Sequence, residues 1–100
     1  MVIVLGSVLV REGQMRDALA LSQEHVKRSR LEPGCIEHAV HIAAENSSQL
    51  VFVERWADQA SLQTHFRVPA SRSFVRALAG LAAEPPTMSV FEAHELPLGA

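Results

Sequence analysis

Segments with a strand-like hydrophobic pattern and segments with a helical one follow each other along the chain. Residues 2–10 consist almost entirely of Val, Ile and Leu, which is typical of a buried strand. From about Gln14 the apolar residues recur at helical spacing, and Pro33-Gly34 ends the predicted helix. Two further strands are predicted at 35–43 and 50–56, with a polar turn between them.

The second half repeats this arrangement. A short helix is predicted after Asp58, a suitable N-cap, and His65 lies on its apolar stripe. Pro69 separates it from a longer helix that is expected to start near Ser71, and residues 87–94 form the last predicted strand. The order βαββαβ predicts an α+β, ferredoxin-like fold, with the helices on one face of a four-stranded antiparallel sheet.

One face of this sheet has no obvious cover. Residues 2–10 and 50–56 are apolar on both sides of the strand, whereas a sheet with one wet face should alternate apolar and polar residues. The helices cover only one face, so the other would expose an apolar patch that soluble monomers usually avoid. We therefore expect a homodimer that pairs through the open sheet face; the alternative is a monomer with scattered surface apolar residues.

Composition narrows the class of protein. The 100 residues, 48% apolar and 20% charged, suit a single globular domain spanning 1–100. A net charge of −2 offers no basic excess for nucleic-acid binding. Residues 1–10 are too short to span a membrane and lack a positively charged start, so we expect no membrane association and a cytoplasmic protein. The single cysteine, Cys35, rules out an internal disulfide.

Two motifs carry a resemblance to a known family. The segment 29–38, SRLEPGCIEH, and the segment 54–58, ERWAD, followed by Leu62 and His65, resemble antibiotic biosynthesis monooxygenase (ABM) domains over residues 2–94. The resemblance implies a dimeric α/β barrel with a substrate pocket between the sheet and the helices of each protomer. For some members it also implies oxygenation of phenols, quinols or anthrones by O2 without metal or flavin, so no cofactor is expected.

Two neighbouring functions fit the residues less well. Haem-degrading members of the superfamily carry an Asn on the first strand and a Trp on the helix after the third, where this chain has Gly6-Ser7 and His65. RNA-recognition modules share the βαββαβ order but need a Lys/Arg-Gly-aromatic motif on the third strand, and residues 50–56 read LVFVERW.

Cofactor-free oxygenation needs a base that deprotonates an electron-rich phenol, whose anion can pass an electron to O2. Histidine suits this role by type, and His65 is the predicted base; the alternative is a structural histidine bonded to a backbone carbonyl. Glu54 is the second predicted catalytic residue, as an orienting group or base. Its alternative is a structural ion pair with an arginine across the interface.

Five further residues are predicted to bind an aromatic substrate. Phe66 and Trp56 would line the pocket, although Trp56 suits core packing equally well. Arg76, with Arg72 one turn away on the last helix, would attract an anionic substrate or form an ordinary solvated helix face. The predicted substrate-binding set is Trp56, Phe66, His38, Phe74 and Arg76.

No metal site is predicted. His38 and His41 lie three apart on one strand and so face opposite sides, and His25 is expected to be solvated on the charged face of the first helix. The leading hypothesis is thus a small monooxygenase that acts on an aromatic quinol, anthrone or polyketide-like ring with O2. The alternative is a non-catalytic small-molecule-binding or regulatory module, and isomerisation instead of oxygenation stays open.

Overall fold

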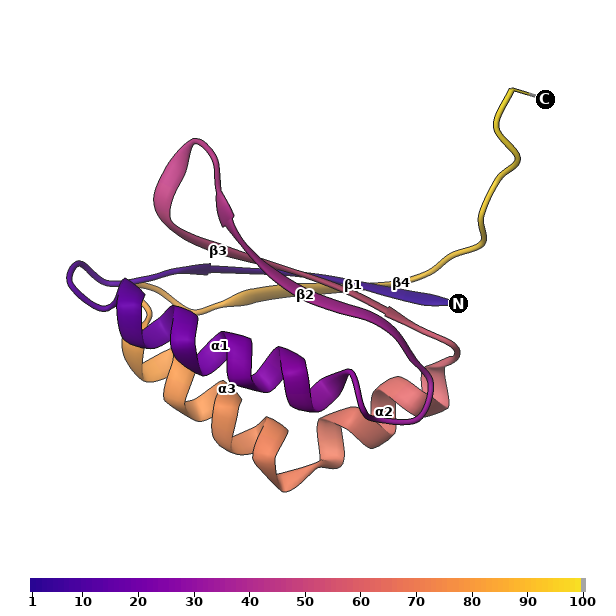
Figure 1. The fold of residues 1–100 in the computed structure, drawn as a ribbon, viewed down its shortest axis with the longest axis horizontal. Helices are drawn as coiled ribbons and strands as arrows, with labels where there is room; N and C mark the ends of the chain where they lie inside the picture. Colours follow the sequence, from indigo (N-terminus) through magenta and orange to yellow (C-terminus); the bar gives the residue numbers. More distant parts are fainter. Residues whose placement is uncertain (100) are drawn as a thin grey trace.

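The computed structural model describes residues 1–99 and contains one four-stranded sheet and three helices over this range. The sheet is antiparallel in the order β2-β3-β1-β4, and the three helices lie together on one of its faces (Figure 1). This confirms the predicted α+β, ferredoxin-like fold. The elements are β1 (Val2–Leu9), α1 (Met15–Ser29), β2 (Cys35–Ala43), β3 (Asn46–Trp56), α2 (Gln59–Arg67), α3 (Pro69–Leu81) and β4 (Thr87–Glu92).

Several boundaries differ from the prediction, and three of them have a bearing on the fold. Strand β3 begins at Asn46 instead of residue 50, because its polar start still pairs with the end of β2, where Ala43 faces Asn46. Helix α3 begins at Pro69 instead of Ser71, since proline at the first helical position gives up no hydrogen bond. Strand β4 ends at Glu92, two residues before the predicted end.

The connection from α1 to β2 brings the start of α2 close to the sheet. Gly34 has a φ of +81°, a conformation that favours glycine, and a Cβ there would lie 2.5 Å from Cβ of Ser61. The predicted N-cap is confirmed, because the carboxylate of Asp58 accepts a hydrogen bond from the backbone N–H of Ser61 at 2.8 Å. Together these contacts set the position of α2 relative to the loop after α1.

The covered face of the sheet holds two apolar clusters with a polar gap between them. One cluster includes Phe52 of β3 and Phe74 of α3, and the other includes Trp56 of β3 and Leu62 of α2. Glu54 lies on β3 between Phe52 and Trp56, on the same side of the strand and equally buried. A carboxylate in the middle of an apolar core needs specific partners, so this gap is where a functional site is expected.

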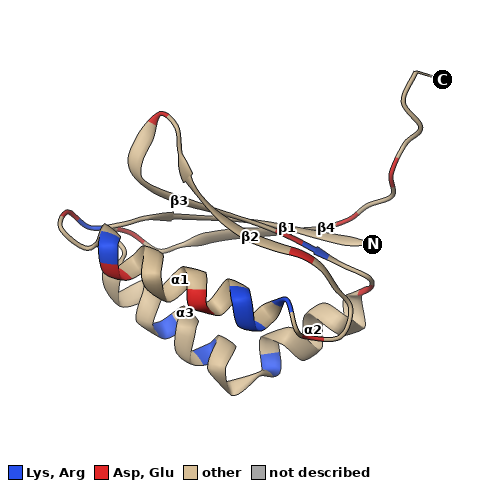
Figure 2. Cartoon of the chain, in the orientation of Figure 1, with Lys and Arg blue, Asp and Glu red and all other residues tan. Residues whose placement is uncertain are grey.

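The opposite face, which we call the open face, has no helix over it (Figure 1). Strand pairing places Leu5 opposite Val53 and Ile3 opposite Phe91, and Leu5 and Phe91 are 47% and 50% exposed. Figure 2 shows most Lys and Arg residues on the helices. The apolar residues of the open face are Ile3, Leu5, Ala39, Val51, Val53 and Phe91.

None of the helices formed by residues 1–99 has both the length and the apolar character required to cross a bilayer.

Candidate functional site

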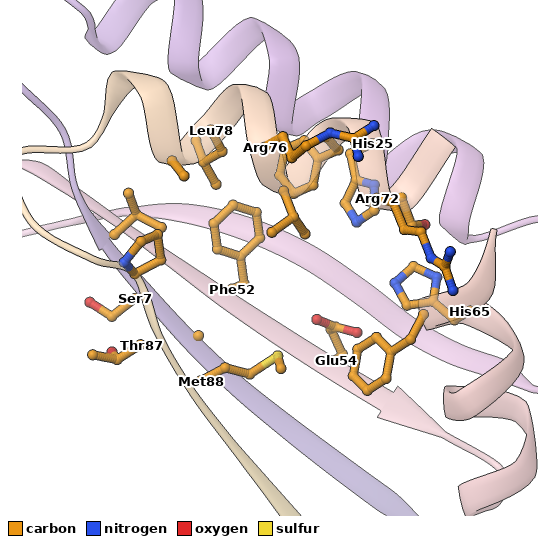
Figure 3. Close-up of a pocket in the computed structure, with 18 of the residues that line it drawn as sticks. Ser7, His25, Phe52, Glu54, His65, Arg72, Arg76, Leu78, Thr87 and Met88 are labelled. Atoms are coloured by element: carbon orange, nitrogen blue, oxygen red, sulfur yellow. The ribbon is translucent and has the colours of Figure 1, made fainter. Parts of the chain in front are cut away.

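A cavity of about 500 Å³ lies between α3 and the covered face of the sheet. Figure 3 shows Ser7 and Thr87 at one end of it, and Glu54 and His65 at the other. Gly6 belongs to the cavity wall, and a Cβ there would lie 3.4 Å from Cβ of Phe52, so the missing side chain keeps this part open. The apolar lining residues are Val8, Phe52, Phe66, Phe74, Val75, Leu78 and Met88.

His65 is held at the polar end of the cavity by a carboxylate. Its Nδ1 lies 2.8 Å from Oε1 of Glu32, which follows α1 in the chain, and the imidazole is almost fully buried. An ionised carboxylate only accepts hydrogen bonds, so Nδ1 of His65 carries the donated proton, and in the neutral form of an imidazole this leaves the lone pair on Nε2. The partner of His65 is therefore the Glu32 side chain and not a backbone carbonyl. Sequence reasoning missed Glu32, although it lies inside the segment 29–38 that resembles the ABM family.

Glu54 faces the same polar end of the cavity. Its Oε1 accepts a hydrogen bond from Nε1 of Trp56 at 2.9 Å and lies 3.3 Å from Nε2 of His38. Burial raises the pKa of Glu54, but the interaction with His38 and the Trp56 hydrogen bond outweigh it, so the pKa lies below its usual value. Glu54 is thus ionised at neutral pH, and its partners among residues 1–99 include no arginine.

Trp56 is not among the residues that line the cavity. Its side chain is fully buried and packs with Val4 and Leu62, on the far side of Glu54 from Phe52. The role that the structure gives to Trp56 is that of a core residue whose indole N–H donates to Glu54. The other four predicted binding residues, His38, Phe66, Phe74 and Arg76, do line the cavity.

The prediction that His25 is solvated is wrong. His25 is 5% exposed, and its ring stacks on Phe74 at 3.9 Å with an interplanar angle of 5°. The side of α1 that carries Ser22, Val26 and Ser29 is the buried side, and His25 lies on it. Burial, followed by repulsion from the neighbouring histidines, lowers the pKa of His25 from 6.5 to about 3, so the ring is neutral at pH 7.

Three histidines from three elements meet at the polar end of the cavity. The ring centroids of His25 and His38 are 5.1 Å apart, and that of His65 lies 5.4 Å and 5.5 Å from them. One ring nitrogen from each lies within 4.8 Å of the others. Nδ1 of His38 has no hydrogen-bond partner among residues 1–99, and Nε2 has only the Glu54 carboxylate at 3.3 Å, although the side chain is almost completely buried. No local motif signals this cluster, because its members come from α1, β2 and α2.

Two arginines lie at the rim of the cavity. Arg72 and Arg76 are on neighbouring turns of α3, and both are exposed (Figure 3). Within the described part of the chain neither pairs with a carboxylate, so their charges are free to act on a ligand.

Comparison with known proteins agrees with this architecture. Residues 1–77 match the family model described as antibiotic biosynthesis monooxygenase. The chain belongs to the ABM family. This confirms the family resemblance seen in the sequence.

Several relatives of this ABM protein are known. The uncharacterized protein sll1783 from Synechocystis is 30% identical over 94 residues, which are 94% of this chain and 64% of that protein, so the chain spans less than two thirds of this relative. A solved antibiotic biosynthesis monooxygenase has a TM-score of 0.87 at 22% identity, covering 95% of this chain and all of its own. Rv0793 from Mycobacterium tuberculosis has a TM-score of 0.88 at 21% identity, covering 95% and 96% of the two chains. At such identities these two structures support the fold alone.

Proposed function

We propose that this ABM protein is a cofactor-independent monooxygenase that oxidises an aromatic quinol, an anthrone or a similar polyketide-like ring with O2. The observation that carries the proposal is the pair formed by Glu32 and His65, because it leaves a histidine lone pair free at the polar end of an apolar cavity. The family match is consistent with this chemistry, because the matching family model is described as antibiotic biosynthesis monooxygenase.

The cavity has a suitable size and lining for such a substrate. Its volume of about 500 Å³ lies within the range of roughly 300–1,000 Å³ typical of small-molecule sites. Phe52 and Phe74 offer flat apolar surfaces against which an aromatic ring can stack. An open apolar cavity of this kind supports an enzyme over a module whose interior is filled by its own side chains.

In this proposal His65 is the general base. Nε2 accepts the proton of a substrate hydroxyl, and the carboxylate of Glu32 stabilises the imidazolium that forms. The substrate anion then passes an electron to O2. One oxygen atom enters the ring and the other leaves as water with two hydrogen atoms of the substrate, so no external reductant is needed.

Glu54 orients the substrate in this scheme. Its Oε1 is occupied by Trp56 and His38, whereas Oε2 makes no hydrogen bond within residues 1–99. That oxygen can accept a hydrogen bond from a second substrate hydroxyl, which suits a quinol. Arg72 and Arg76 at the rim attract substrates with a negative charge.

We also propose that the protein, as a single domain over residues 1–100, works as a homodimer paired through the open face. ABM family members are generally small dimeric proteins. Leu5 and Phe91 are about half exposed in the single chain, and a second copy that covers them would remove an apolar patch from water.

The test is O2 uptake by chelator-treated protein with a panel of quinols and anthrones, beside His65→Gln and the control His94→Gln, at an exposed residue after β4. Uptake that is lost only in His65→Gln supports the proposal. Unchanged uptake in His65→Gln moves the base elsewhere, with Glu54 the next candidate. Binding of the same compounds without any enzyme-dependent uptake identifies the chain as a non-catalytic binding module.

A further inference from the structure

We infer that His25, His38 and His65 form a binding site for one divalent transition-metal ion at the polar end of the cavity. Three imidazole nitrogens suit borderline ions such as Zn²⁺, Co²⁺, Ni²⁺ and Cu²⁺ rather than Mg²⁺ or Ca²⁺, which prefer oxygen ligands. The inference goes beyond the proposed oxygenation and does not depend on it.

The three histidines are close enough to share one ion. One nitrogen from each of the three rings lies within 4.8 Å of the others. Around a tetrahedral zinc with Zn–N bonds of about 2.0–2.1 Å, two ligand nitrogens lie about 3.3 Å apart. Small rotations of the rings toward a common centre therefore close the site. All three residues also line the cavity, so a fourth coordination position faces open space.

His38 is poorly satisfied for a buried residue. Its side chain is 1% exposed, Nδ1 has no hydrogen-bond partner among residues 1–99, and Nε2 has only the Glu54 carboxylate, 3.3 Å away, without a well-formed hydrogen bond. Buried polar groups in proteins are nearly always partnered, so the free nitrogen of this imidazole calls for an explanation. Coordination of a metal by His38 supplies a partner for a nitrogen that the surrounding side chains leave free.

The histidine cluster also has negative charge beside it. Glu32 lies against His65 at 2.8 Å and Glu54 lies 3.3 Å from His38, and neither carboxylate pairs with a Lys or Arg within the described residues. Two carboxylates balance the charge of one divalent ion. The hydrogen bond from Nδ1 of His65 to Glu32 also has the form of a carboxylate–histidine–metal arrangement, in which Nε2 is the ligand atom.

One neighbour must move when the metal binds. A terminal guanidinium nitrogen of Arg28 lies 2.6 Å from Nδ1 of His25. A guanidinium group can only donate, so Nδ1 of His25 accepts this hydrogen bond. A metal on Nε2 requires the proton on Nδ1, and this tautomer cannot accept from Arg28. The positive charge of Arg28 also opposes a bound cation. Removal of Arg28 is therefore expected to strengthen metal binding.

The metal and the proposed substrate compete for the same atom. Nε2 of His65 cannot coordinate an ion and accept a phenol proton at once, so loaded protein is expected to lose cofactor-free O2 uptake. Metal binding itself is measured without substrate, which keeps the two proposals separate.

The test is titration of the chelator-stripped full chain with Co²⁺, followed by visible absorption, and with Zn²⁺, followed by calorimetry. We expect one ion per chain and an intense, tetrahedral-type cobalt spectrum. His25→Gln and His38→Gln should weaken binding by about 10- to 100-fold or more, whereas His41→Gln and His94→Gln, which lie outside the cluster, should leave it unchanged.

Arg28→Met should bind the metal more tightly than the wild type. A variant that fails to fold would bind less, so this test does not depend on the folding of the histidine variants. Failure of the stripped protein to bind either ion at millimolar concentration overturns the inference. Binding that persists unchanged in His25→Gln and His38→Gln also overturns it, and so does weaker binding in Arg28→Met. A chain that binds metal, and that in its chelator-stripped form binds the quinols or anthrones without enzyme-dependent O2 uptake, refutes the proposed oxygenation and leaves the metal site standing.

Discussion

Glu32 and His65 are 33 residues apart in the chain, yet a hydrogen bond of 2.8 Å joins Oε1 of the first to Nδ1 of the second. This bond links the loop after α1 to the buried side of α2. It sets both the orientation of the imidazole and the nitrogen that carries the proton, and these are the two properties that a histidine base requires.

Replacement of Glu32 by Gln should lower kcat for O2 uptake by about 10- to 100-fold with little change in KM, because the amide neither fixes the tautomer nor stabilises the imidazolium. Glu24→Gln is the matched control, since Glu24 is exposed on α1 and does not line the cavity. Equal rates for Glu32→Gln and the wild type would show that the carboxylate does not assist the base.

The stability of the metal-free protein should fall as the pH drops from about 6.5 toward 3. Below 6.5 the unfolded chain binds a proton at His25, whereas the folded chain, with the pKa of His25 lowered to about 3, does not. The unfolded state therefore gains stability, at most about 1.4 kcal/mol per pH unit from this group. The lowered pKa of Glu54 also makes the folded state less stable in acid, but only at pH values below 4.5, the ordinary pKa of a glutamate side chain.

Urea unfolding at pH 7, 6 and 5 in the presence of a chelator measures this effect. His25→Gln should flatten the dependence in this interval, and His41→Gln, on the exposed part of β2, should follow the wild type. If the unfolding free energy of His25→Gln falls with pH as steeply as that of the wild type, the acid sensitivity comes from another group.

Gly34→Ala should destabilise the fold more than Gly13→Ala. Both glycines have a φ of +81°, which costs about 1–2 kcal/mol for alanine, but only a Cβ at residue 34 meets a neighbour, Ser61 of α2. We therefore expect a loss of about 3 kcal/mol or more for Gly34→Ala, measured by chemical denaturation. Equal losses of unfolding free energy at the two sites would mean that α2 moves away from the new Cβ without destabilising the fold.

Leu5→Lys should dissociate the proposed dimer, because it places a charge at the centre of the open face. Leu31→Lys is the control, since Leu31 is 87% exposed and lies after α1, away from the sheet. Light scattering coupled to size exclusion should give a dimer for the wild type and Leu31→Lys, and a monomer for Leu5→Lys. A dimeric Leu5→Lys would move the interface to another surface.

Arg76→Gln should raise KM for a carboxylated aromatic substrate by up to about fivefold and leave KM for a neutral analogue unchanged. Arg67→Gln is the control, because Arg67 is exposed on α2 and does not line the cavity. The difference should shrink at high ionic strength, where exposed charges are screened. A similar rise in KM for both substrates would mean that Arg76 contributes contact area and not charge.

The element order, the fold class and the apolar open face of this ABM protein can all be predicted from its sequence. Each depends on the period of apolar residues over a few neighbouring positions, and such a period is a local property. Glu54 and His65 also stand out locally, one as a carboxylate on an apolar strand and the other as a histidine on an apolar helical stripe.

The assembly of the site depends on long-range packing and cannot be predicted from the local pattern of residues. The orientation of α1 turned His25 from an expected surface residue into a buried one, and the loop after α1 brought Glu32 to His65. Packing with Val4 and Leu62 took Trp56 away from the cavity. These outcomes depend on which turn of a helix faces which strand, and this is settled by contacts between residues that lie far apart in the chain.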